Sequence, residues 1–207
     1  MQIARITGTP LYDTFRHSGA TLSAQTLRYF TNGVGANASG FTSSPYKTLA
    51  ETNLIGGSGL PNGMSFRVEK VGVYCRISDA IATPGVQTAT EQFEDIGAIL
   101  RNSVLQFEQG SDLLTLGPAE FFPAGCGLVG ASVGTGGATG AYSQASVVNG
   151  ASDQRGMYSL PEPIILEDGT NFQFNLKVVR DTTIQLSTNA FDISVLLWGI
   201  SFQRIQP

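Results

Sequence analysis

The sequence predicts an all-β protein: a single jelly-roll β-sandwich with one short helix and a long extended N-terminal arm. Three observations support this prediction. Short runs of alternating apolar and polar residues recur along the later part of the chain, and turn signals rich in glycine, proline, asparagine and aspartate separate them. Only one segment repeats its apolar residues with a helical period. The first 61 residues show little periodicity of either kind.

The expected arm covers residues 1–61, and the expected jelly-roll domain covers residues 62–207. Between Arg28 and Lys47 the chain has 18 consecutive uncharged residues, most of them small or polar. Such a stretch cannot build a core of its own. We therefore expect the arm to lie along another surface, and we expect a chain without residues 7–60 to fold but not to assemble.

The first strand of the expected sandwich follows the turn signal Asn62–Gly63 and changes phase in its middle. Phe66 and Val68 share one parity, whereas Val71 and Val73 have the other. One extra residue in a strand turns all later side chains to the opposite face. A β-bulge is therefore expected near Lys70.

The one expected helix covers residues 88–101. Thr88 and Glu91 have the spacing of a capping box, and an apolar stripe at Phe93, Ile96 and Leu100 follows. After the helix, the period returns to two.

Three further segments predict strands. Residues 104–116 read as a hairpin, with Leu105 and Phe107 on one strand and Leu114 and Leu116 on the other. Residues 171–178 alternate between apolar and polar side chains, so one face is buried. In the final run both parities are apolar, which predicts a central strand with Trp198 in the core.

Charge and cysteine content exclude several classes. The net charge is −4, with 12 basic against 16 acidic residues, and the basic residues are scattered singly. Direct binding to nucleic acid, which needs clustered cations, is not expected. The two cysteines, Cys75 and Cys126, have neither a CxxC spacing nor a companion histidine, so a zinc site is not expected. Whether they form a disulfide stays open.

No targeting or membrane segment is expected. The N-terminus lacks the apolar core of a signal peptide, and no run of 18 strongly apolar residues occurs. We therefore expect synthesis in a host cytoplasm.

Two short motifs match enzyme signatures but lack the context that the chemistry needs. Residues 125–130 match GxGxxG, which binds a pyrophosphate only where a helix follows the turn. Residues 130–134 match GxSxG, which needs a histidine after the serine, yet the only histidine is His17. We therefore expect no enzyme activity, no catalytic residues, no cofactor and no metal.

A long uncharged segment is the strongest functional signal. From Phe121 to Ser152, 32 residues pass without a charge. A charge-poor surface is typical of contacts that are always covered, because buried charges are costly unless they are paired. Together with apolar residues of the arm, the segment predicts a subunit interface at Leu11, Phe15, Tyr29, Phe30, Phe121, Phe122 and Tyr142.

Four runs carry a resemblance to a known family: ETNLIGGSGLPNGMSFRVEKVGVY, LLTLGPAEFFPAGCGL, YSLPEPIILEDGTNFQFNL and ISVLLWGISFQRIQP. Over roughly residues 50–207 the chain resembles jelly-roll coat proteins of small tailless bacteriophages. The resemblance implies paired four-stranded sheets whose loops meet neighbouring subunits. Coat proteins that touch the genome often carry a basic arm, which is absent here. The resemblance therefore fits a shell around an internal membrane, or another virion part such as a vertex or fibre protein.

The function expected from these observations is that of a structural virion protein. A capsid protein would self-assemble into an icosahedral shell through its arm and uncharged loops, with itself and other virion proteins as partners and the virion as its location. The alternative is a receptor-binding or carbohydrate-binding β-sandwich with exposed aromatic side chains in a groove, for which Phe121, Tyr142 and Tyr158 are the candidates.

Overall fold

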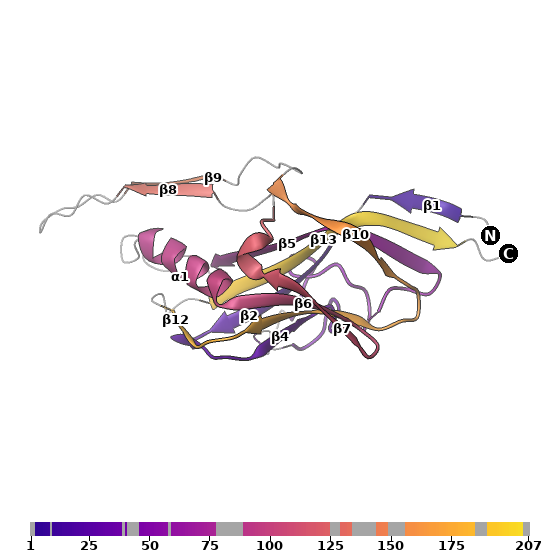
Figure 1. Cartoon of the computed structure of the whole chain (residues 1–207), viewed down its shortest axis with the longest axis horizontal. Helices are drawn as coiled ribbons and strands as arrows, with labels where there is room; N and C mark the ends of the chain where they lie inside the picture. The colour runs from indigo at the N-terminus through magenta and orange to yellow at the C-terminus, as the bar shows by residue number, and fades with distance from the viewer. Residues whose placement is uncertain are drawn as a thin grey trace, which may run out of the picture.

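The computed structural model describes residues 3–8, 10–38, 40, 46–57, 59–77, 89–124, 129–133, 144–148, 156–184 and 190–204. Two antiparallel sheets pack face to face, and the hydrophobic core lies between them (Figure 1). The expected all-β sandwich with one α-helix is therefore confirmed for the part of the chain that the structure describes.

The first sheet has the order β2–β13–β5–β10. Its strands are β2 (Leu11–Ser18), β13 (Ala190–Arg204), β5 (Met64–Ile77) and β10 (Tyr158–Leu166). Strand β1 (Ile3–Thr7) pairs with the C-terminal end of β13 and so continues the edge that β2 occupies. The two long strands, β5 and β13, pair along almost their whole length and form the centre of this sheet.

The second sheet has the order β4–β11–β6–β7. Its strands are β4 (Thr26–Tyr29), β11 (Phe172–Val178), β6 (Ser103–Gln109) and β7 (Asp112–Pro118). The chain passes repeatedly from one sheet to the other, and strands that are distant in sequence become neighbours. The strand orders of the two sheets are compatible with jelly-roll connectivity.

Smaller elements surround the two sheets. Strand β3 (Thr21–Leu22) pairs with β12 (Thr182–Thr183), and β8 (Val129–Val133) pairs with β9 (Gln144–Val148). The helix α1 (Ala89–Arg101) precedes β6, and the single turn η1 (Ala119–Phe121) follows β7.

The β-bulge expected in β5 is present. Lys70 pairs with Trp198 and Val68 pairs with Gly199, so Glu69 is the extra residue of β5. The apolar residues on both sides of the bulge are buried in the core: Phe66, Val68, Val71 and Val73. The change of parity in the sequence therefore marks a change in backbone pairing while the buried face stays the same.

The helix and the alternating strand also match their predictions. Ile99 of α1 is fully buried, and Ile96 and Leu100 pack against the core. Phe174 and Leu176 of β11 are fully buried, as the period of two requires. The expected capping box cannot be compared, because Thr88 and the side chains of Glu91 and Phe93 lie outside the described residues.

The expectation of an N-terminal arm is wrong for residues 11–30. These residues supply β2 at the edge of the first sheet and β4 at the edge of the second, and Tyr29 and Phe30 are fully buried in the core. Further along, Leu54 and Leu60 are also core residues. The boundary at residues 61–62 therefore does not separate an arm from a folded domain. Local periodicity missed β4 because it has only four residues, and it missed β2 because buried and exposed residues do not alternate along that strand.

The 104–116 hairpin forms as predicted, and Leu114 is 52% exposed because β7 is an edge strand that pairs on one side only. The prediction for Trp198 needs correction. Trp198 is half-buried rather than a fully buried core residue, since its side of β13 is the outer face of the first sheet. The neighbouring Val195 and Leu197, on the inner face, are fully buried.

Candidate interaction surfaces

The structure divides the predicted interface residues into three groups. Tyr29, Phe30 and Phe122 are buried in the core of the subunit, so the prediction that they contact a neighbouring subunit is wrong. Leu11 and Phe15 are half-buried and pack against the core. Phe121 is 58% exposed, whereas Tyr142 lies outside the described residues.

The turn η1 explains why two consecutive phenylalanines have opposite environments. The Phe122 carbonyl accepts a hydrogen bond from Val73 N–H at 2.8 Å, which fastens the end of the turn to β5. The Phe122 ring packs on Tyr158, with ring centroids 4.8 Å apart. Because the backbone is held there, the Phe121 side chain faces outward and presents an apolar ring at the surface.

That packing bears on the carbohydrate-binding alternative. The Tyr158 ring packs on Phe122 inside the subunit. Of the three aromatic candidates, Phe121 is therefore the one that the described residues leave as an exposed ring.

A buried ion pair holds the segment after β4 against β2. Asp13 points into the sandwich and is fully buried, and its carboxylate lies 2.7 Å from Lys47 Nζ. The same carboxylate accepts a hydrogen bond from Phe30 N–H at 2.7 Å. Phe30 has a positive φ of 64°, an uncommon conformation for a residue with a side chain. Burial raises the pKa of Asp13, and the charge of Lys47 opposes that shift.

Polar pairs also join β2 and β13 on the outer face of the first sheet. Arg16 binds Asp192 through two hydrogen bonds, Nε to Oδ1 at 2.8 Å and a guanidinium amine to Oδ2 at 3.1 Å. Thr14 and Ser194 share a hydrogen bond of 2.8 Å two residue pairs further along, on the same face. Asp192 is fully buried and Arg16 is 25% exposed, which makes this cross-strand pair part of the sheet structure.

The outer face of the second sheet carries a network of amide and carboxylate groups. Glu108 accepts hydrogen bonds from Gln173 and from Asn175 Nδ2, the latter at 2.8 Å. These two hydrogen bonds, with Gln173 first, lower the pKa of Glu108 and keep it ionised. Asn175 is 4% exposed, and its Oδ1 has no hydrogen-bond partner in the structure.

Exposed apolar side chains concentrate on two parts of the described surface. The first is the segment between β4 and β5, with Leu49 at 64% and Ile55 at 75% exposure. The second is β7, where Leu113 and Leu114 are 57% and 52% exposed. Solvent-exposed leucine and isoleucine side chains in such groups are typical of contact surfaces.

The enzyme motifs have no catalytic setting in the described residues. Ser132 of the GxSxG match lies inside β8, paired with Ala145 of β9, so it does not stand at a strand-to-helix elbow. His17 is half-buried, and burial lowers its pKa. No group of three metal-ligating side chains is found in the part of the chain that the structure describes.

Sequence reasoning missed the charged residues that organise the first sheet. Asp13 and Lys47 are 34 residues apart, and Arg16 and Asp192 are 176 apart. Both separations are too long for helix or strand periodicity to predict the contact. The one signal was the position of Asp192 within a mostly apolar strand. Cys75 is a free buried thiol, and burial raises its pKa to about 12.

Comparisons with known proteins gave no relative. No family model, no curated protein and no solved structure matches the chain. Among the described helices, none has the length and apolar character needed to cross a membrane. The described residues form an antiparallel β-sandwich.

Proposed function

We propose that this chain is a structural virion protein, a capsid protein that self-assembles into an icosahedral shell. The observation that carries the proposal is the pair of facing sheets, one of five and one of four strands, whose strand orders are compatible with a jelly roll. This agrees with the family that the sequence resembles. Fold alone does not imply function, so the proposal also rests on the surface.

The surface supports contacts with identical neighbours. The chain has 14% charged residues, against roughly 25% in average soluble domains. Exposed apolar side chains such as Leu49, Ile55 and Phe121 stand on loops and turns around a rigid sandwich. Symmetric repetition makes many weak contacts of this kind collectively strong.

The decisive experiment measures the mass of the recombinant chain by size-exclusion chromatography with light scattering. We expect trimers, pentamers, hexamers or larger particles at concentrations between about 1 µM and 1 mM, since weak contacts need high concentration. Because the proposed contacts are apolar and neutral, raising the salt from about 50 to 500 mM should not dissociate them. A monomer at every concentration and salt would contradict the proposal.

A matched pair of variants tests the surface directly. Phe121→Asp places a charge on the exposed ring position, and Val179→Asp does the same at another exposed apolar residue, 45% exposed. We expect Phe121→Asp to weaken assembly more than Val179→Asp, with both chains folded by circular dichroism. Equal assembly of the two variants would show that Phe121 does not contribute to the interface.

A carbohydrate-binding module is the second candidate, and one observation favours it. Glu108 and Gln173 present hydrogen-bonding groups on the outer face of the second sheet, where the buried Asn175 supports Glu108 with a hydrogen bond. Sugars are recognised by such polar groups. A glycan-array signal that Glu108→Ala and Gln173→Ala abolish would favour this function. No signal on the array, together with oligomers in solution, would favour the capsid function.

A further inference from the structure

The edge strands of the two sheets are protected to very different degrees. An edge strand exposes a row of unpaired N–H and C=O groups, and proteins usually protect it with charges, prolines or a covering segment. Strand β2 is covered: Tyr12 N–H donates to Asn53 Oδ1 at 3.0 Å, and Asn53 N–H donates to the Tyr12 carbonyl at 3.3 Å. Asn53 Nδ2 also binds the Pro10 carbonyl at 2.7 Å.

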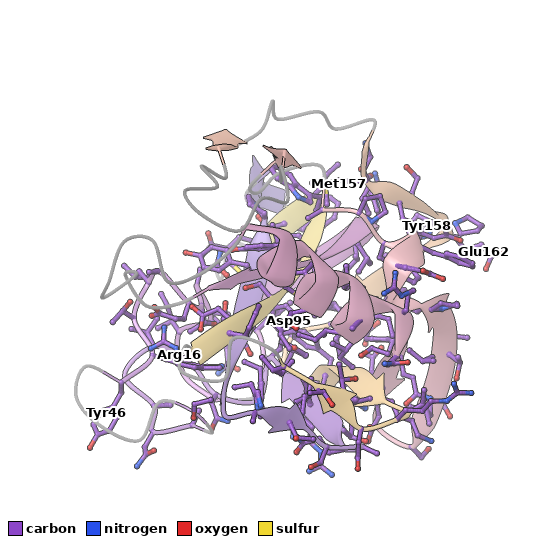
Figure 2. The ribbon with its side chains drawn as sticks, turned by 90° about the vertical axis from the view of Figure 1, so that its left-hand side faces the viewer. Arg16, Tyr46, Asp95, Met157, Tyr158 and Glu162 are labelled. Carbon is purple, nitrogen blue, oxygen red and sulfur yellow. The ribbon has the colours of Figure 1, made fainter. Side chains whose placement is uncertain are left out.

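The other edges carry charges or prolines. Strand β10 contains Pro161 and Pro163, which lack an N–H, with the exposed Glu162 between them (Figure 2). Strand β4 is only four residues long and contains the exposed Arg28. Strand β1 has Arg5 at its centre.

Strand β7 has only one of these protections in its first half, the charge of Asp112 at its first residue. It pairs with β6 on one side, and on its other side the described residues make no backbone hydrogen bond to it. Residues 113–115 include no charge and no proline, and all of the residues from Asp112 to Thr115 are exposed. Leu113 and Leu114 expose more than half of their side chains on opposite faces of the strand.

The open stretch ends at a bulge. Leu105 pairs with Gly117 and Gln106 pairs with Thr115, so Leu116 is an extra residue that interrupts the ladder. Gly117 has a positive φ of 144° at the same point. The free edge is therefore a short segment, Asp112–Thr115, next to the hairpin turn.

We propose that β7 pairs antiparallel with β7 of a second copy of this chain and joins two second sheets across a two-fold axis. The edge is self-complementary, because two antiparallel copies of one strand exchange the same N–H and C=O groups. A two-fold axis at Leu113, Leu114 or Thr115 does not set Asp112 opposite Asp112. With the axis at Leu114, that side chain faces its own copy on one face of the joined sheets, and Leu113 faces Thr115 of the second copy on the other. This inference rests on the proposed function of self-assembly.

The size of the contact fits assembly better than a permanent dimer. A specific stable interface buries about 1,200–2,000 Å² in total, and four residues of one strand pair bury much less. The pairing would therefore be weak alone and effective only when many subunits repeat it. A weak contact of this kind also avoids the uncontrolled aggregation that a long open edge would cause.

Disulfide crosslinking tests the pairing directly. We would introduce Leu113→Cys, Leu114→Cys and Thr115→Cys one at a time, with Cys126→Ser as the background and Val179→Cys as an exposed control. The remaining Cys75 is buried and does not react in the folded chain. Copper-phenanthroline with air would oxidise two thiols to a disulfide, for which the Cα atoms must lie within about 7 Å.

We expect the residue on the two-fold axis to form the covalent dimer about tenfold faster than Val179→Cys at the same concentration. If oligomers form but none of the three variants crosslinks faster than the control, the edge pairing is wrong and the proposed function stands. If the β7 variants crosslink faster than the control but the chain never exceeds a dimer, the result supports the β7 pairing and contradicts the proposed shell. A monomer without crosslinks would overturn both.

A charge on the edge supplies a second test. Leu114→Lys puts the kind of residue that protects natural edge strands at a position that is already half-exposed, so the subunit should stay folded. We expect the variant to lose assembly at concentrations where Val179→Lys retains it. Undiminished assembly of Leu114→Lys would overturn the proposal.

Discussion

At the scale of single residues, the buried pair of Asp13 and Lys47 is the feature on which the N-terminal third depends. Its two charges are almost fully hidden, with 0% and 4% of the side chains exposed, and they connect β2 to the segment after β4. Removing one partner of a buried pair leaves an uncompensated charge, which is more costly than losing both.

The first prediction therefore compares single and double variants. Lys47→Met should lower the free energy of unfolding by about 3–5 kcal/mol, whereas Asp13→Asn with Lys47→Met should restore part of that loss. Urea unfolding followed by Trp198 fluorescence measures both. Lys177→Met, at an exposed lysine of β11, is the control and should change stability little. A Lys47→Met chain as stable as this control would contradict the prediction.

The second prediction concerns His17, the single histidine of the chain. Burial lowers its pKa below the ordinary 6.5, so the neutral ring is favoured in the folded state. As the pH falls below 6.5, the unfolded chain binds a proton that the folded chain does not. The free energy of unfolding should therefore be highest above this pH and fall as the pH drops through the folded pKa.

An NMR titration of the His17 ring measures the shift, and His17→Gln serves as the control. The variant should lose the part of the pH dependence that lies just below pH 6.5. A His17 ring that titrates at or above 6.5 would show that burial does not dominate its environment.

At the scale of elements, the strands from residues 11 to 29 decide how the protein can be divided. Strand β2 pairs with β13 over eight residue pairs, and β4 pairs with β11 over four. Both are edge strands, yet they bring Leu27, Tyr29 and the neighbouring Phe30 into the core. The third prediction follows from this arrangement.

Deleting residues 7–60 should abolish folding, in contrast to the expectation from sequence. The deletion removes one strand from each sheet and several buried aromatic and aliphatic side chains, each worth about 2–5 kcal/mol when truncated. Deleting residues 1–8 removes only β1 and should leave a cooperative unfolding transition. Circular dichroism and thermal unfolding compare the two, and a folded 7–60 deletion would restore the arm interpretation.

At the scale of the whole molecule, charge limits the partners. The net charge is −4, and among the described cations Arg16 and Lys47 are bound to carboxylates, whereas Arg28, Lys177 and Arg180 are exposed. A protein that holds a genome directly needs free clustered cations to displace counterions from phosphates. We therefore do not expect the proposed shell to bind nucleic acid directly.

The fourth prediction is that the assembled protein does not retain nucleic acid. At about 150 mM salt, purified oligomers should show the absorbance ratio of pure protein, and neither single-stranded nor double-stranded DNA should shift in a gel. A shift that weakens steeply with added salt would reveal a basic surface and contradict the prediction.

Local patterns in the sequence predict the features that depend on neighbouring residues. The period of two in 171–178, the helical stripe in 88–101 and the phase change near Lys70 each reflect neighbours along the chain, and the structure confirms all three. The sequence pattern also indicated the β-sandwich class. These properties follow from which side chains share a face, and that depends only on backbone geometry.

Which residues that are distant in sequence become neighbours in space depends on the tertiary structure. Thr14 and Ser194 are 180 residues apart in sequence and form a hydrogen bond. Asp13 forms an ion pair with Lys47, although the segment between them has no periodicity. The same long-range pairing placed Tyr29, Phe30 and Phe122 in the core and left β7 as an open edge. Burial and edge position depend on strand order, and strand order is set by non-local contacts that no local pattern in one chain contains.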